Sequence, residues 1–292
     1  MSEIPFATYE NWIILGDATD STLTLNKLSN TKGPDGQLHF PLMNLYNSAF
    51  EEIWNEVLIK IKYLGLKGAR LANTMGDGFL VLGVPETGIM TSGYQMPLIL
   101  EFAKKIKYTA DEILSKLKQN VNNMAEDKIG NILLKENQNL KMRILISHGN
   151  VYESFLHNRY MGDSINYGSK ILSYIYRDCI GEPVIFVDNL PNGDNLWLPE
   201  IIETFEQYKI RTKPINLDEI DDKYINHYDR VRDPEVYKIP IDRIDLLVGE
   251  MKQRLGDNLK HSKDDFVDRV RWFFKNHIHW INEDSFKDYC PF

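Results

Sequence analysis

Cysteine is scarce in this chain, which holds only Cys179 and Cys290 among its 292 residues. Two cysteines give neither a disulfide framework nor a metal-ligand spacing, so we expect free thiols in a reducing cytosol. The first residues lack the basic and apolar regions of a secretory signal, and no apolar run approaches the roughly 20 residues of a membrane-spanning helix. These absences predict a soluble, cytoplasmic protein without a membrane partner.

Positive charge is also limited, with 34 basic against 42 acidic residues and a formal net charge of -8. The chain has no long basic run, which argues against binding of duplex nucleic acid. The negative charge also argues against a palm-type polymerase, which would need a basic groove for its template. With 43% hydrophobic residues the chain can bury a sizeable core.

Hydrophobic periodicity predicts strands and helices in alternation. Buried strands are expected at residues 12–16, 69–74, 79–84, 141–147, 183–187 and 236–239. Helices are expected at residues 40–62 and 97–121, from residue 164 onward, and at 241–255 and 264–276. This order predicts an α+β fold in which helices pack on an open sheet. Residues 122–138 are predicted to be a polar insertion, and residues 241–292 a C-terminal helical appendage.

Two aspartates, Asp17 and Asp77, each lie beside a predicted core strand. An unpaired carboxylate is costly in such a place, and two carboxylates repel each other unless a cation lies between them. Oxygen ligands suit Mg²⁺ or Mn²⁺, so a divalent metal site is one interpretation. The alternative is purely local, with Asp17 as a helix N-cap and Asp77 as a turn residue.

Several short blocks of the sequence carry a family likeness. Asp17-Ala-Thr-Asp-Ser-Thr22 is similar to the pattern D-x-x-G-F/S-T, with Asp20 in place of the glycine. Thr74-Met-Gly-Asp77-Gly is similar to T-x-G-D-G/A. Arg143-Ile-Leu-Ile-Ser-His-Gly149 and Tyr160-Met-Gly-Asp163-Ser-Ile-Asn166 are similar to R-x-G-I/V-x-x-G and G-D/N-x-V/I-N. In this order the blocks resemble the catalytic domain of the class III nucleotide cyclases over about residues 10–240. The resemblance implies a cyclase domain at residues 1–240 with a ferredoxin-like, palm-type sheet.

The resemblance also implies a mechanism for the two aspartates. Asp17 and Asp77 would hold two divalent ions, Mn²⁺ or Mg²⁺, for attack of a ribose 3'-hydroxyl on the α-phosphorus of a nucleoside triphosphate, with loss of pyrophosphate. The backbone N–H groups of the turn that follows Asp17 would bind phosphate oxygens. The turn residues expected to contact substrate are Ala18, Thr19, Ser21 and Thr22.

Two further residues match catalytic positions of the family. Asn166 corresponds to the asparagine that orients the ribose. Lys170, four residues later, stands where the family usually has an arginine that stabilises the transition state, and lysine supplies the charge without the planar fork. The usual late lysine near the last strand has no clean counterpart, and Arg230 and Arg232 are the candidates to replace it.

The positions that normally select the base carry Asn73 and Arg159. Neither established purine pairing is present. Arginine offers only donors, whereas asparagine offers a donor and an acceptor, a set that matches the edge of uracil and does not exclude cytosine. The chain therefore resembles the pyrimidine cyclases of bacterial anti-phage systems, which implies UTP as substrate and cyclic UMP as product, ahead of CTP and then of ATP or GTP. The alternative for Arg159 is a surface residue or a phosphate clamp.

In this family the active site is shared between two chains. The resemblance thus implies a head-to-tail homodimer in which Asp17 and Asp77 of one chain meet Asn166, Lys170 and the base-selecting residues of the other. The cyclic nucleotide would then act on a downstream effector. The competing hypothesis is a catalytically inactive cyclase-like domain that only binds a nucleotide.

Overall fold

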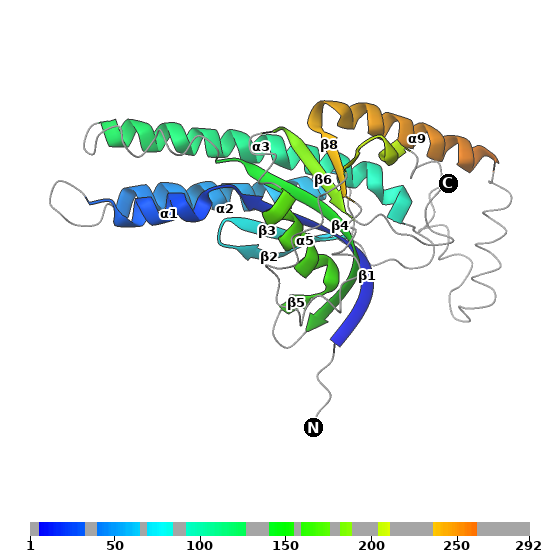
Figure 1. Cartoon of the computed structure of the whole chain (residues 1–292), viewed down its shortest axis with the longest axis horizontal. Helices are drawn as coiled ribbons and strands as arrows, with labels where there is room; N and C mark the ends of the chain where they lie inside the picture. Colours follow the sequence, from blue (N-terminus) through cyan, green and yellow to red (C-terminus); the bar gives the residue numbers. More distant parts are fainter. Residues whose placement is uncertain are drawn as a thin grey trace, which may run out of the picture.

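The computed structural model describes residues 6–32, 40–64, 69–83, 92–126, 140–154, 159–175, 182–188, 204–210 and 236–261. Within these segments helices cover both faces of one mixed sheet (Figure 1). The expected α+β fold is therefore confirmed. No helix in the described segments has the length and apolar character needed to cross a membrane.

The sheet is built around two long central strands, β1 (Phe6–Ala18) and β4 (Met142–Ser154), which pair antiparallel along their full lengths. The strand order among the described residues is β2-β3-β1-β4-β6-β8-β7, and β5 pairs with the far end of β4. The other strands are β2 (Arg70–Met75), β3 (Gly78–Leu82), β5 (Arg159–Met161), β6 (Val184–Asp188), β7 (Lys209–Ile210) and β8 (Val236–Pro240). Only the β4–β6 pair is parallel among these pairs.

Side chains of β1 alternate between the two faces of the sheet, which gives the protein two cores. Trp12, Ile14 and Ala18 join the core beneath helices α2 (Phe40–Tyr63) and α3 (Ser92–Glu126). Ile13 and Leu15 join the opposite core, beneath α5 (Asp163–Ile175). Because both faces are covered there, residues 12–15 of β1 form a continuous apolar run rather than an alternating one.

The described part of the C-terminal segment is packed into the main core. A short 3-10 turn (Ile241–Arg243) leads into α9 (Ile244–His261), which lies beside α3 (Figure 1). Buried side chains from this segment share the core of α2 and α3, namely Ile241, Ile244, Leu247, Val248 and Met251. The boundary at residue 240 stays a prediction, since residues 262–292 lie outside the described segments.

Several sequence predictions about elements are corrected. Residues 122–126 continue α3 instead of starting a polar insertion, and the rest of that insertion is not described. The strand predicted to end at Ser147 runs on to Ser154, because β1 pairs with β4 through Gly149. The short strand β5 was not predicted, since three residues are too few to show a period.

Candidate active site

The β2–β3 hairpin brings Asp77 next to Asp17. Asp17 lies opposite Gly78 in the antiparallel register of β1 and β3, so Asp77 is one residue from the strand pair. Gly76 takes φ +58, a left-handed conformation that glycine adopts at little cost, and this allows the tight turn. The two aspartates therefore lie at neighbouring strands, where β1 ends and β3 begins.

Asp17 forms an ion pair with Arg143, its partner across the β1–β4 ladder. The Arg143 guanidinium also donates from Nη1 to the carbonyl oxygen of Leu172 in α5, at 3.1 Å. One arginine thus contacts both the Asp17 carboxylate and the helix that carries Asn166 and Lys170. Arg143 lies in one of the sequence motifs, but no role was predicted for it.

Asp77 lies in a half-buried environment made by α1 (Ser21–Asn30) and α2. The Ser21 hydroxyl donates to Oδ2 of Asp77, and the Ser21 and Tyr46 side chains are also hydrogen-bonded. Burial raises the pKa of Asp77 above its ordinary value, although a hydrogen bond from its own backbone opposes this. Burial and then the negative charge of Asp77 raise the pKa of Tyr46 to about 12. Tyr46 therefore stays a neutral phenol beside the carboxylate.

The backbone conformation at Asp20 accounts for an aspartate where the compared motif has glycine. It has φ 52 and ψ 14, the left-handed region, immediately before α1. Glycine fits this region best, and aspartate is one of the few other residues that enter it readily. Its exposed side chain makes no capping hydrogen bond. The left-handed conformation at this position is thus one that either glycine or aspartate can adopt.

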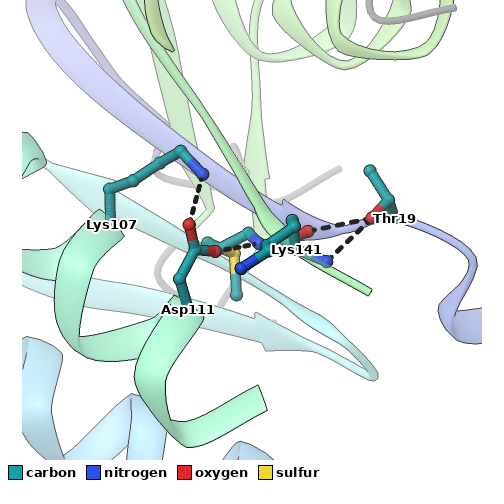
Figure 2. A network of polar contacts seen from close by, with 5 residues as sticks. Thr19, Lys107, Asp111 and Lys141 are labelled. Atoms are coloured by element: carbon teal, nitrogen blue, oxygen red, sulfur yellow. Dashed lines mark hydrogen bonds and ion pairs between the residues drawn. The ribbon is translucent and has the colours of Figure 1, made fainter. Parts of the chain in front are cut away.

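The turn after Asp17 is held against the start of β4 through Thr19. The Thr19 N–H donates to the carbonyl oxygen of Lys141 at 2.9 Å, and the Lys141 N–H donates to Oγ1 of Thr19 at 2.9 Å (Figure 2). The Thr19 N–H is therefore already engaged within the chain. A phosphate would instead meet the first turn of α1, at Ser21 and Thr22, whose N–H groups have no partner within the helix.

A buried ion pair supports this junction from α3. Lys107 has a side chain only 3% exposed, and its Nζ lies 2.8 Å from Oδ2 of Asp111 (Figure 2). The other oxygen of Asp111 accepts the N–H of Met142, at 2.8 Å. Burial lowers the pKa of Lys107, while Asp111 opposes that shift. The pair thus fixes the first residues of β4, which in turn hold Thr19.

This ion pair was not predicted, although the sequence contains a signal for it. Lys107 lies on the apolar stripe of α3, between Ala103 and Ala110, with an aspartate one turn later. A lysine on a buried stripe needs a partner at helical spacing. That pattern alone would have pointed to Asp111.

Helix α5 carries Asn166 and Lys170 on its outer side. Ile165, Tyr167 and Ile171 face the sheet, and Gly168 lets the helix approach so closely that an added Cβ would lie 2.7 Å from Leu15. Asn166 is exposed and Lys170 is half-buried. Within one chain the structure therefore brings Asp17, Asp77 and Ser21 together, while Asn166 faces solvent.

The two predicted base-selecting positions lie on strands that do not neighbour each other. Asn73 is exposed on β2 opposite Leu80, just after a bulge in the β2–β3 register, and Arg159 begins β5 opposite Ser154. Arg230 and Arg232 lie outside the described residues. Their proposed role stays a prediction.

The donor chemistry of this edge fits a hard divalent cation. Asp17 and Asp77 supply carboxylate oxygens. Burial raises the pKa of Asp77, so its ionised form is poorly hydrated and a cation beside it would favour that form. Among the described residues no group of three or more histidine, cysteine, aspartate or glutamate side chains is close enough to hold a metal. Further ligands would have to come from backbone, water or substrate, as is usual for Mg²⁺.

Known proteins similar to this chain were found by structure and not by sequence. The sequence matches no protein-family profile, and no curated protein is significantly similar to it. The guanylyl cyclase Cya2 is 17% identical with a TM-score of 0.43, and the match covers 80% of this chain and 92% of that one. The adenylyl cyclase CyaB from P. aeruginosa is 13% identical with a TM-score of 0.44, covering 80% and 95%. A bacterial light-regulated adenylyl cyclase is 15% identical with a TM-score of 0.41, covering 64% of this chain and 44% of that one. In fold, the chain is similar to these nucleotide cyclases.

Proposed function

We propose that this chain is a nucleotide cyclase that converts UTP to 3',5'-cyclic UMP and pyrophosphate. The observation that carries the proposal is the adjacency of Asp17 and Asp77 at the β1–β3 edge, with Ser21 at the start of α1 bonded to Asp77. This arrangement joins a carboxylate pair to a helix N-terminus. Carboxylates hold cations and a helix N-terminus attracts phosphate, so the two features suit a metal-bound triphosphate.

The proposed reaction makes one phosphorus–oxygen bond and breaks another. The ribose 3'-oxygen attacks the α-phosphorus and loses its proton to solvent, while the bond from the α-phosphorus to the bridging oxygen breaks and pyrophosphate leaves. Two divalent ions, Mn²⁺ or Mg²⁺, held by Asp17 and Asp77 would supply Lewis-acid stabilisation of the attacking and leaving oxygens. Arg143 orients Asp17, Ser21 orients Asp77, and the first turn of α1 binds phosphate oxygens.

We propose that the site is completed by a second copy of the chain. The exposure of Asn166 on α5 supports this, because a side chain that faces solvent in one chain is available to a second chain. In the dimer, Asn166 would orient the ribose and Lys170 would stabilise charge on the transferring phosphate. Two equivalent sites follow from head-to-tail symmetry.

The choice of base is assigned to Asn73 and Arg159. Their hydrogen-bond donors and acceptor match uracil best and cytosine second. The order of expected substrates is therefore UTP, then CTP, then ATP or GTP. A pyrimidine product supports a second-messenger role in anti-phage defence, in which cyclic UMP activates an effector protein.

The test is incubation of the purified chain with each of the four nucleoside triphosphates and Mn²⁺, with cyclic product and pyrophosphate both measured. Cyclic UMP should dominate, and Asp77→Asn should abolish it while the circular dichroism spectrum stays unchanged. Dominant cyclic AMP or cyclic GMP would overturn the pyrimidine assignment and keep the cyclase. A folded chain that binds nucleotide but forms no cyclic product would instead establish the inactive binding module, which the Asp17–Arg143 ion pair favours because it already neutralises one carboxylate.

A further inference from the structure

Three side chains from three different strands form one polar cluster, which we call the Arg70 cluster. Nη2 of Arg70 on β2 lies 2.5 Å from Oε2 of Glu153 on β4. The Arg70 guanidinium carbon lies 5.4 Å from the ring centroid of Tyr160 on β5. Tyr160 pairs with Glu153 in the β4–β5 register, and their side chains are hydrogen-bonded. Each member therefore contacts both of the others.

The cluster joins parts of the sheet that are not neighbours. Strands β3 and β1 separate β2 from β4 in the sheet order. β3 stops pairing with β1 at Ile13, so β1 and β4 continue toward Ser154 with the short strand β5 beside β4. Narrow extensions of a sheet twist strongly, so their ends need a tertiary contact to have a defined place. The Arg70–Glu153 contact, between residues 83 apart in the chain, supplies one.

The strands joined in this way carry the two proposed base-selecting positions. Asn73 lies three residues after Arg70 on β2, beyond the bulge between Leu71 and Asn73. Arg159 directly precedes Tyr160 on β5. The Arg70 cluster thus lies next to both positions in the chain and bonds their two strands to each other.

The chemistry of the cluster suits a rigid link. The Glu153 side chain is only 9% exposed, and a carboxylate at that depth needs a cation beside it. The planar guanidinium of Arg70 can bond a carboxylate and lie over an aromatic ring together, which a lysine ammonium does less well. The cluster therefore holds its strands through geometry as well as charge.

We propose that Arg70, Glu153 and Tyr160 are positioning residues that set the spacing of Asn73 and Arg159 and so determine which nucleobase is accepted. This inference rests on the proposed function. It assigns selectivity to three residues that need not touch the base themselves.

The test compares Arg70→Met, Arg70→Lys and Tyr160→Phe with the wild type. For each protein kcat/KM is measured with UTP, CTP, ATP and GTP, and equilibrium binding of the same four nucleotides is measured in parallel. Lys104→Met is the matched control, because Lys104 also forms a 2.5 Å ion pair between distant segments, with Asp245 on α9.

Arg70→Met should lower the ratio between the best and worst nucleotide by about tenfold, since a small misplacement of contact groups is costly. Arg70→Lys and Tyr160→Phe should each lower it less, and Lys104→Met should leave it unchanged. A parallel loss with all four nucleotides, at a constant ratio, would show a merely structural cluster and overturn the inference. If the wild type binds nucleotides without turnover, the ratio between its strongest and weakest nucleotide affinities replaces the ratio of kcat/KM values, and the same outcomes support or overturn the inference. A chain that binds no nucleotide at all would overturn both this inference and the proposed function.

Discussion

Ser21, the first residue of α1, donates a hydrogen bond from its hydroxyl to the carboxylate of Asp77 at the tip of the β2–β3 hairpin. The contact links the turn that follows β1 to a loop 56 residues later in the chain. It also lies where Tyr46 reaches from α2, so three elements converge on one carboxylate. That convergence makes Asp77 both a candidate metal ligand and a source of instability when no cation is present.

Replacement of Asp77 by asparagine should separate these two properties. Because burial raises its pKa in the folded state, Asp77 binds protons more readily folded than unfolded. Its cost to stability is absent below the unfolded pKa of about 3.9 and grows as pH rises through the folded pKa. Without metal, Asp77→Asn should therefore melt at a higher temperature than the wild type at pH 7, and the difference should shrink toward pH 4.

Thermal melts in EDTA and in Mn²⁺ provide the measurement. Mn²⁺ should raise the melting temperature of the wild type and leave Asp77→Asn unchanged, while cyclase activity of the variant falls by about a thousandfold or more. Equal stabilisation of both proteins by Mn²⁺ would contradict a metal at Asp77.

Removing only one partner of the Lys107–Asp111 pair should lower the stability of the protein more than removing both. Asp111→Asn leaves a buried ammonium without its carboxylate, which destabilises a protein by about 3–5 kcal/mol. The double variant Lys107→Met/Asp111→Asn removes both charges, keeps an oxygen that can accept the Met142 N–H, and should be less destabilised than Asp111→Asn alone. Urea unfolding curves measure the difference.

The same helix supplies a control for this prediction. Lys116 and Glu112 form an ion pair at the same spacing and the same 2.8 Å, but on the exposed side of α3. Glu112→Gln should leave the unfolding midpoint where it is, because an exposed pair contributes little. A loss as large as that of Asp111→Asn would contradict the importance of burial.

The left-handed backbone at Asp20 makes a third prediction. Asp20→Gly should keep or slightly raise stability, whereas Asp20→Ala should lower it by about 1 kcal/mol, since alanine has no side-chain compensation for a positive φ. The two variants control each other because both remove the same exposed carboxylate. Equal effects on the melting temperature would mean that charge, rather than backbone conformation, determines the preference at this position.

Local sequence features predicted the meeting of Asp17 and Asp77, because a hairpin turn and strand pairing fix their relative places. They did not predict the use of the Thr19 N–H, the Asp17–Arg143 pair or the Arg70–Glu153 contact. Each of these joins residues between 83 and 126 positions apart, across elements whose packing no local pattern specifies. The sequence showed that Asp20 replaces the glycine of the motif. Only the positive φ of Asp20 shows why an aspartate is tolerated there.

A shared active site makes the final prediction. Asp17→Ala removes the metal half of a site and Asn166→Ala removes the ribose half, so each homodimer should be inactive. After random exchange of subunits, half of the dimers contain one chain of each kind and one intact site, which should restore about a quarter of wild-type activity. The control mixture is Asp17→Ala with Asp77→Ala, which damages the same half twice and should restore nothing. Native mass spectrometry confirms that mixed dimers have formed. Inactive mixed dimers of the first kind, or equal recovery in the control, would contradict a site built from two chains.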